Sequence, residues 1–219
     1  RHMSSVKKVF APVLDKIWVA SQNGNVLTYH GKSKIIKSIP REWGRKMWQQ
    51  FSKLKCVDGI LDTATEMYCP FEKTPMHKIL TDDYHFDVVG TGSWDQIPDE
   101  DFSMMTLYHP EKPEDICKEF IEDKWKGKLE FLSSGKFWID IVMPEVGKGT
   151  ALEEICSQLE ISPEETIAFG DNLNDISMLQ SAGKGYAVNT AREATKKAAD
   201  EVIPGYAENG VLEVLKTFL

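Results

Sequence analysis

The sequence predicts an α/β protein in which a core built on a parallel sheet carries an inserted α+β domain. Beyond residue 147, short apolar runs such as 166–169 alternate with stretches of helical periodicity. This alternation is typical of a parallel sheet covered by helices on both faces. Between residues 26 and 134, single strands and helices are mixed without that alternation, which favours an α+β domain.

The elements before residue 143 follow from apolar spacing and turn residues. Residues 17–20 form an apolar run that ends in the turn sequence SQNGN at 21–25, and Trp43, Met47 and Phe51 share one face of a helix. In chain order we expect a helix at 4–14, a strand at 17–20, a hairpin at 26–29 and 34–39, a helix at 40–54, strands at 59–69, 86–91 and 102–108, a helix at 113–125, and strands at 129–132 and 137–142.

The last third of the chain alternates regularly. We expect helices at 150–159, 174–182, 191–199 and 210–219, and strands at 166–169, 185–188 and 202–203. The strands are too short and too apolar to alternate polar and apolar residues, so both faces of this sheet should be buried.

Composition narrows the possible partners. The net charge of -8 disfavours a nucleic-acid partner, because the chain repels phosphate backbones. No apolar run reaches the roughly 18 residues of a membrane span, and the start of the chain does not resemble a secretory signal. The four cysteines, Cys56, Cys69, Cys117 and Cys156, form no CxxC pair, and reduced thiols are expected. We therefore expect a cytoplasmic protein without a membrane partner.

The strongest chemical signal is the sequence GDNLND at residues 170–175. It lies between an apolar strand and a helix, and ligands of parallel sheets bind at the carboxyl ends of strands. Asp171 and Asp175 are therefore candidate ligands of a hard cation such as Mg²⁺, which prefers carboxylate and water oxygens. Helix capping by Asp and Asn is the structural alternative. Capping explains one of these residues but does not require the full motif.

A second signal is Lys148 within the sequence GKGT at 147–150, directly before a predicted helix. A lysine opposes the helix dipole at this end, whereas an anion would be stabilised by the ammonium, the free N–H groups and the dipole together. A solvated loop lysine is the alternative. The spacing of a P-loop is absent, because no glycine stands five residues upstream of Gly147.

These motifs resemble the third and fourth motifs of the haloacid dehalogenase (HAD) superfamily, in particular its Cof-type members with a large α+β cap. IVMPEVGKGTAL at 141–152 is similar to motif three, and TIAFGDNLNDISML at 166–179 is similar to motif four. GYAVNTAREATKKAAD, ENGVLEVL and SQNGN resemble segments that follow or precede these motifs in the family. The resemblance runs along the whole chain. It implies a HAD-like Rossmannoid core from residues 1–25 and 135–219, and a cap from residues 26–134.

The resemblance also implies a reaction and assigns roles in it. The reaction would be magnesium-dependent hydrolysis of a small phosphorylated metabolite. Asp171 would bind Mg²⁺, Asp175 would support the metal or its waters, Lys148 would neutralise the phosphoryl group, Asn174 would donate to a phosphoryl oxygen, and Asn23 would contact the substrate.

One family motif is not found. The nucleophile and the general acid of the family are the aspartates of a DxDx[T/V] motif on the first strand. The nearest string, DEDFS at 99–103, follows no apolar strand. We therefore expect the nucleophile, with a β-α-β unit of about 30 residues, to lie outside this chain, and this chain alone to be inactive.

Several alternatives stay open from the sequence. The chain could be a HAD-like binding or regulatory protein that has the same fold but no nucleophile. It could also be a phosphosugar mutase or transferase, which would use the same fold and site for a different reaction. A response-regulator receiver is disfavoured because Asp171 follows Lys148, the reverse of that family's order. The substrate and the oligomeric state are not indicated.

Overall fold

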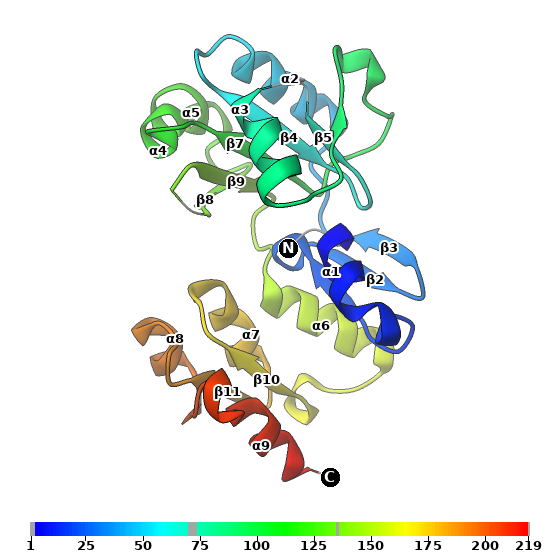
Figure 1. Ribbon diagram of the computed structural model, residues 1–219, viewed down its shortest axis with the longest axis vertical. Helices are drawn as coiled ribbons and strands as arrows, with labels where there is room; N and C mark the ends of the chain where they lie inside the picture. Colours follow the sequence, from blue (N-terminus) through cyan, green and yellow to red (C-terminus); the bar gives the residue numbers. More distant parts are fainter. Residues whose placement is uncertain (1–2, 70–73, 135, 219) are drawn as a thin grey trace. The chain divides into compact units, whose positions relative to one another are not determined.

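The computed structural model describes residues 3–69, 74–134 and 136–218. The chain divides into two compact units, residues 1–145 and residues 146–219, whose elements are labelled in Figure 1. Each unit is described by itself.

The first unit opens with helix α1 (Met3–Phe10) and a small antiparallel sheet. Its strands are β1 (Val19–Ser21), β2 (Val26–Tyr29) and β3 (Lys32–Ile35), in that order. His30 and Gly31 join β2 to β3 with φ values of 48° and 75°, the left-handed backbone that two-residue hairpin turns require. The predicted hairpin is confirmed, although its second strand ends earlier than expected.

The larger sheet of the first unit has six strands in the order β6-β5-β4-β7-β9-β8. All neighbouring pairs are antiparallel except β5 and β6. The strands are β4 (Asp58–Asp62), β5 (Met67–Cys69), β6 (Val89–Gly90), β7 (Met104–Tyr108), β8 (Glu130–Ser133) and β9 (Trp138–Val142). Strand pairing thus groups β9 with β7 and β8, whereas the sequence assigns residues from 135 onward to the core. The domain boundaries at residues 25 and 134 stay a prediction.

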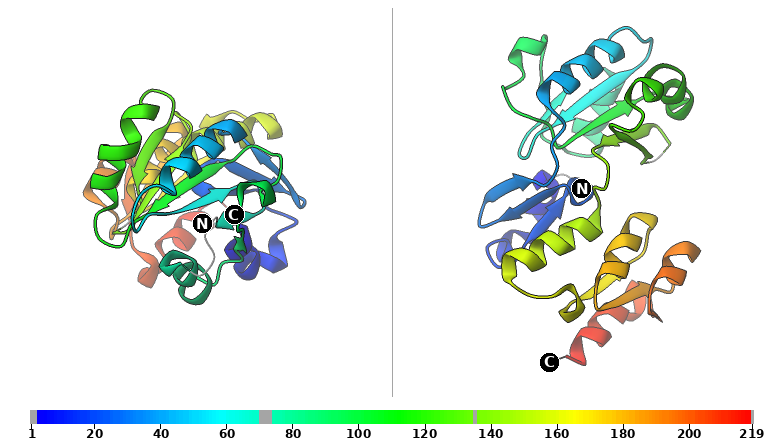
Figure 2. Two further views of the ribbon diagram at one scale, coloured as in Figure 1. Left: turned by 90° about the horizontal axis from the view of Figure 1, so that it is seen from above. Right: turned by 180° about the vertical axis from the view of Figure 1, so that it is seen from behind.

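Helices α2 and α5 (Asp123–Trp125) lie on one face of this sheet, as Figures 1 and 2 show. Helix α2 (Arg41–Phe51) buries Met47 and Phe51 in one cluster with Leu61 of β4. Ile60, the neighbour of Leu61, belongs to a second cluster with Met76, because successive strand residues point to opposite faces.

The remaining helices of the first unit are α3 (Pro75–Lys78), which contributes to the second cluster, and α4 (Pro113–Cys117) and α5 (Asp123–Trp125), which contribute to the first. A π-helical turn at Lys118–Glu122 joins α4 to α5. The helix predicted over 113–125 is therefore present but not regular throughout.

The second unit alternates strands and helices around a parallel sheet in the order β10-β11-β12. The strands are β10 (Ile167–Gly170), β11 (Lys184–Val188) and β12 (Glu201–Ile203), and the helices are α6 (Lys148–Leu159), α7 (Ile176–Ser181), α8 (Glu193–Ala198) and α9 (Gly210–Lys216). Figure 2 shows the same elements from behind. The α/β class with a parallel sheet is confirmed.

Side chains on adjacent strands fix the register of the parallel sheet. Phe169 of β10 pairs with Tyr186 of β11, and their rings stack with centroids 5.2 Å apart. Ala168 and Ala187 are buried beside them. The carboxyl end of β10, where the 170–175 motif begins, is thereby packed against β11.

Within the part of the chain that the structure describes, no helix is both long enough and apolar enough to cross a membrane.

A buried carboxylate stands at the end of β4. Asp62 is 1% exposed, and neither of its carboxylate oxygens has a hydrogen-bond partner among the described residues. Burial, and then the nearby charge of Asp140, raise the pKa of Asp62 well above its ordinary value. The ionised form therefore destabilises the folded state, because a buried charge without a partner is costly.

Asp62→Asn is expected to stabilise the protein at pH 8. Because the folded-state pKa is raised, the wild-type carboxyl is compatible with folding below its unfolded pKa of about 4 and becomes destabilising as pH rises through the folded-state pKa. Denaturant unfolding at pH 4 and pH 8 should show a gain of about 1–3 kcal/mol at pH 8 and little gain at pH 4. The exposed Asp83→Asn is the matched control. A loss of stability at pH 8 would contradict the proposed cost of the charge.

Candidate active site

The loop after β10 turns so tightly that it requires glycine at position 170. A Cβ atom on Gly170 would lie 2.5 Å from the Cβ of Asp175, closer than non-bonded carbon atoms approach. Without a side chain at 170, the chain folds back and Asp175 lies against the end of the strand. This close approach positions the whole 170–175 motif.

Asp175 is buried and organises the loop from within. It is 3% exposed, and its Oδ2 accepts hydrogen bonds from the backbone N–H of Asp171 at 2.9 Å and of Asn172 at 3.0 Å. The side chain of Asn172 in turn accepts a bond from the N–H of Leu173 at 2.9 Å. The loop conformation is therefore specified by its own polar side chains, in the manner of a helix cap.

The other oxygen of Asp175 contacts the second predicted motif. Lys148, the first residue of α6, forms an ion pair with Oδ1 of Asp175 through its Nζ. The lysine side chain is 34% exposed and the aspartate side chain 4%, so the pair extends from the interior to the surface. The structure thus brings together Lys148 and Asp175, which the sequence places 27 residues apart.

The start of α6 is fixed by its own contacts. The hydroxyl of Thr150 donates to the carbonyl of Gly147 at 2.8 Å and accepts from the N–H of Gly147 at 3.1 Å. The N–H of Gly149 donates to the hydroxyl of Ser177 in α7 at 3.1 Å. A Cβ atom on Gly149 would lie 2.9 Å from the backbone of Ser177. Lys148 is therefore the first residue of a helix whose start packs directly against α7.

Opposing effects act on the pKa of Asp175. Burial is the largest single effect and raises the pKa, but the hydrogen bond from Lys148, those from the backbone of Asn172 and Asp171, and the charge of Lys148 together lower it below its ordinary value. Hydrogen bonds to the ionised form stabilise that form. Asp175 is therefore ionised at neutral pH and holds Lys148 by charge as well as by geometry.

Asp171 and Asn174 are exposed on the same loop. The carbonyl oxygen of Asp171 accepts a bond from the N–H of Arg192 at 3.0 Å, which anchors this backbone next to the start of α8. Asn23 belongs to the first unit, where it lies half-buried in a short helical turn with a φ of 57°. Its predicted contact with the substrate stays a prediction.

The carboxylates fit the way in which proteins hold magnesium. The two carboxylate oxygens of Asp175 have about four acceptor positions, and three of them accept hydrogen bonds. One acceptor position therefore remains for a metal or its water. Asp171 presents an exposed carboxylate at the end of the strand. Magnesium is commonly held by one or two carboxylates and completes its shell with water and substrate phosphate. Over residues 3–69, 74–134 and 136–218, no three His, Cys, Asp or Glu side chains form a metal-holding group, which is compatible with a site of this open kind.

Sequence reasoning did not identify Ser177 or Thr150. Ser177 accepts one hydrogen bond from the backbone N–H of Gly149, and Thr150 makes two hydrogen bonds with the backbone of Gly147. Thr150 does stand three residues after Gly147, the spacing of a cap. Ser177 gives no local signal, because its partner Gly149 is 28 residues away.

Comparison with known proteins places the whole chain in one family. The model of the haloacid dehalogenase-like hydrolases matches residues 1–215. Phosphatase YwpJ of Bacillus subtilis is 29% identical over 98% of this chain and 84% of its own length. A solved structure from Eubacterium rectale has a TM-score of 0.93 at 32% identity and covers 100% of this chain and 83% of its own.

A further solved structure extends the comparison to a sugar phosphatase. BT4131, described as a HAD subclass IIB sugar phosphatase, has a TM-score of 0.73 at 25% identity over 98% of this chain and 79% of its own. These matches confirm the resemblance that the motifs indicated: the chain belongs to the haloacid dehalogenase-like hydrolase family, in its Cof-type group.

Proposed function

We propose that this protein is a cytoplasmic, magnesium-dependent phosphatase of small phosphorylated metabolites, either sugar phosphates or phosphorylated cofactors. The observation that carries the proposal is the ion pair between Lys148 and Asp175 at the carboxyl end of β10, beside the exposed carboxylate of Asp171. Relatives named as a phosphatase and as a sugar phosphatase support this choice of reaction.

Each residue of the loop has a role in this proposal. Asp171 would hold Mg²⁺, which supplies positive charge and orients a phosphoryl group when bound. Lys148 would contact a phosphoryl oxygen, because an ammonium has three N–H donors and one of them already bonds Asp175. Asn174 would donate its amide N–H to another phosphoryl oxygen. Asp175 positions Lys148 and orders the loop.

The nucleophile of the proposed reaction would be an aspartate of a DxDx[T/V] motif, and in these 219 residues no such motif follows an apolar strand. Its carboxylate oxygen would attack phosphorus, the P–O bond to the metabolite would break, and the released alcohol would take a proton from a neighbouring acid. Water would then cleave the aspartyl phosphate to give inorganic phosphate. Lys148 would balance the negative charge of both steps, which is the main demand of phosphoryl transfer.

The domain assignment belongs to the same proposal. Residues 26–134 would be the cap that selects the leaving group, and Asn23 would contact the substrate. Residues 1–25 and 135–219 would be parts of the core, and β9 would belong to the core by sequence while it pairs with β7 and β8.

Phosphate release tests the proposal. The chain is expressed with its natural upstream DxDx[T/V] segment and supplied with hexose phosphates, pyridoxal phosphate or p-nitrophenyl phosphate. We expect turnover with Mg²⁺ that falls by at least about a hundredfold with EDTA and returns when Mg²⁺ is restored. The 219-residue chain alone should be inactive. Magnesium-dependent turnover by the chain alone would show that the nucleophile lies within it. An extended chain that is folded but inactive on every substrate would favour a binding protein.

A further inference from the structure

Two neighbouring hollows in the first unit are lined by lysines. The first has a volume of about 420 Å³ and the second of about 430 Å³. Lys53 lines both hollows, so they form one continuous surface, which we call the lysine surface. Both volumes lie within the range of small-molecule sites.

The charge of the lysine surface is opposite to that of the protein. Among the described residues, its lining includes one carboxylate, Glu111, and six lysines: Lys46, Lys53, Lys55, Lys112, Lys124 and Lys128. The chain as a whole has a net charge of -8. Like charges that share a small area repel one another, and an anion between them would relieve that repulsion.

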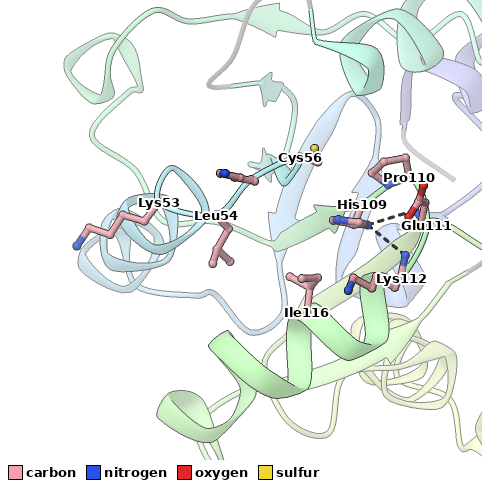
Figure 3. Close-up of a pocket in the computed structure, with 9 residues that line it drawn as sticks. Lys53, Leu54, Cys56, His109, Pro110, Glu111, Lys112 and Ile116 are labelled. Atoms are coloured by element: carbon pink, nitrogen blue, oxygen red, sulfur yellow. Dashed lines mark hydrogen bonds between the residues drawn. The ribbon is translucent and has the colours of Figure 1, made fainter.

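The first hollow adds a directed hydrogen-bond donor. Nδ1 of His109 accepts bonds from the backbone N–H groups of Glu111 at 3.2 Å and Lys112 at 3.1 Å. A nitrogen that accepts is not protonated, so the proton of the neutral ring is on Nε2. His109 is 7% exposed, and Figure 3 shows its ring pointing into the hollow, away from the two dashed bonds. The ring therefore presents an N–H donor to whatever occupies this space.

The second hollow is built on regular helix spacing. Trp43, Lys46 and Gln50 of α2 line it at intervals of three and four residues, which places them on one side of the helix. Lys53, which also lines it, follows the end of α2 by two residues. Trp43 packs against the core cluster that contains Met47 and Phe51, whereas Lys46 and Lys53 are exposed. The lysines of this hollow therefore lie outside the core.

Contacts among the lining residues fix the walls of the second hollow. Nε1 of Trp125 donates to Oε1 of Gln50 at 2.9 Å, and Nζ of Lys128 lies 5.7 Å from the ring centre of Trp43. Lys46 pairs with Glu42 at 2.5 Å, one turn earlier on the same helix. The indole rings and the amide therefore have ordered positions, while Lys53 and Lys124 are exposed.

We propose that the lysine surface binds a compact polyanion that carries several phosphate groups, through residues other than Lys148 and Asp171. Ammonium groups bind phosphate as point charges without demanding a single orientation, so several of them around linked hollows suit a short chain of phosphates. A long polyanion such as RNA would also meet the acidic remainder of the chain, which repels it. The surface therefore selects short ligands over long ones.

Calorimetric titration of the 219-residue chain with tripolyphosphate in EDTA tests this site. We expect tripolyphosphate to bind at least about tenfold more tightly than orthophosphate, because it engages several lysines. Lys53→Gln, and separately Lys124→Gln with Lys128→Gln, should each weaken binding about tenfold. Lys216→Gln on α9, a lysine paired with Glu213, is the matched control and should bind like the wild type. Lys148→Ala should also leave the affinity unchanged.

The outcomes separate this proposal from its rivals. Equal affinity for orthophosphate and tripolyphosphate, or unchanged affinity in both the Lys53 and the Lys124/Lys128 variants, would overturn it. Loss of binding in Lys148→Ala alone would assign the ligand to the proposed catalytic site instead. Tighter binding of a single-stranded oligonucleotide than of tripolyphosphate would reject the compact ligand. Thermal unfolding checks that each variant is folded.

Discussion

Lys148→Ala is expected to lower kcat/KM for phosphate release by about a hundred- to a thousandfold in the chain extended with its DxDx[T/V] segment. The ammonium is held at the start of α6 by its bond to Asp175, so it meets a phosphoryl group without further ordering. Charge that is positioned in advance contributes more to the transition state than to the bound substrate. The loss should therefore be mainly in kcat.

Two further variants make this result specific. Lys184→Ala removes a lysine of the same unit that pairs with Glu201 at 2.9 Å, and it should retain wild-type turnover. Lys148→Arg restores the charge with a different shape and should recover part of the activity. If Lys148→Ala turns over as the wild type does, the lysine has no role in the chemistry and the proposed site is wrong.

Asp175→Asn is expected to reduce the free energy of unfolding by about 2–4 kcal/mol at pH 7. The substitution removes the charge that pairs with Lys148. An amide oxygen in the place of Oδ2 can still accept the two backbone N–H bonds, but the amide NH2 then replaces Oδ1 and faces the ammonium of Lys148. Because Asp175 is 3% exposed, water cannot take the place of the lost carboxylate oxygen in the folded state.

The pH dependence of this difference has a defined sign. The folded-state pKa of Asp175 is lowered, so its stabilising contribution is full above the unfolded pKa of about 4 and is lost as pH falls through the folded-state pKa. Urea unfolding of wild type and variant in EDTA should therefore show a large difference at pH 7 that shrinks below about pH 4. Asp171→Asn, an exposed carboxylate of the same loop, should change stability by less than about 0.5 kcal/mol. A constant difference from pH 3 to pH 7 would contradict the role of the ionised carboxylate.

The second unit was predictable because its signals are local. A continuous apolar run followed by glycine and aspartate specifies a strand and then a turn, and the strand predicted at 166–169 is observed as β10. The helix predicted at 150–159 begins earlier, at Lys148. The cap bonds between Gly147 and Thr150 account for this early start.

The six-stranded sheet was less predictable because its pairing is not local. Residues 86–91 suggest a strand by composition, but the strand found there among the described residues is the two-residue Val89–Gly90, paired with β5. Residues 137–142 do form a strand, yet its partners β7 and β8 follow from packing across the sheet and not from spacing along the chain. Periodicity identifies a strand but does not name its neighbours.

In the candidate site, too, the sequence did not predict which residues contact one another. The sequence indicated Asp175 as a metal ligand, and that role stays a prediction. What the sequence could not indicate is that the same carboxylate bonds Lys148 and two backbone N–H groups. Those bonds depend on the approach of Gly170 to Asp175 and on the position of α6, which only the folded chain defines.

The contact between Gly149 and Ser177 has a consequence for how this site tolerates change over evolution. Since a Cβ at 149 would lie 2.9 Å from the Ser177 backbone, any larger residue there would force the two helices apart and move the ammonium relative to the aspartate loop. Leu173, by contrast, is 53% exposed and can be exchanged without moving either. During evolution, substitutions should therefore accumulate slowly at Gly149 and quickly at Leu173, although Gly149 has no chemical role in the proposed reaction.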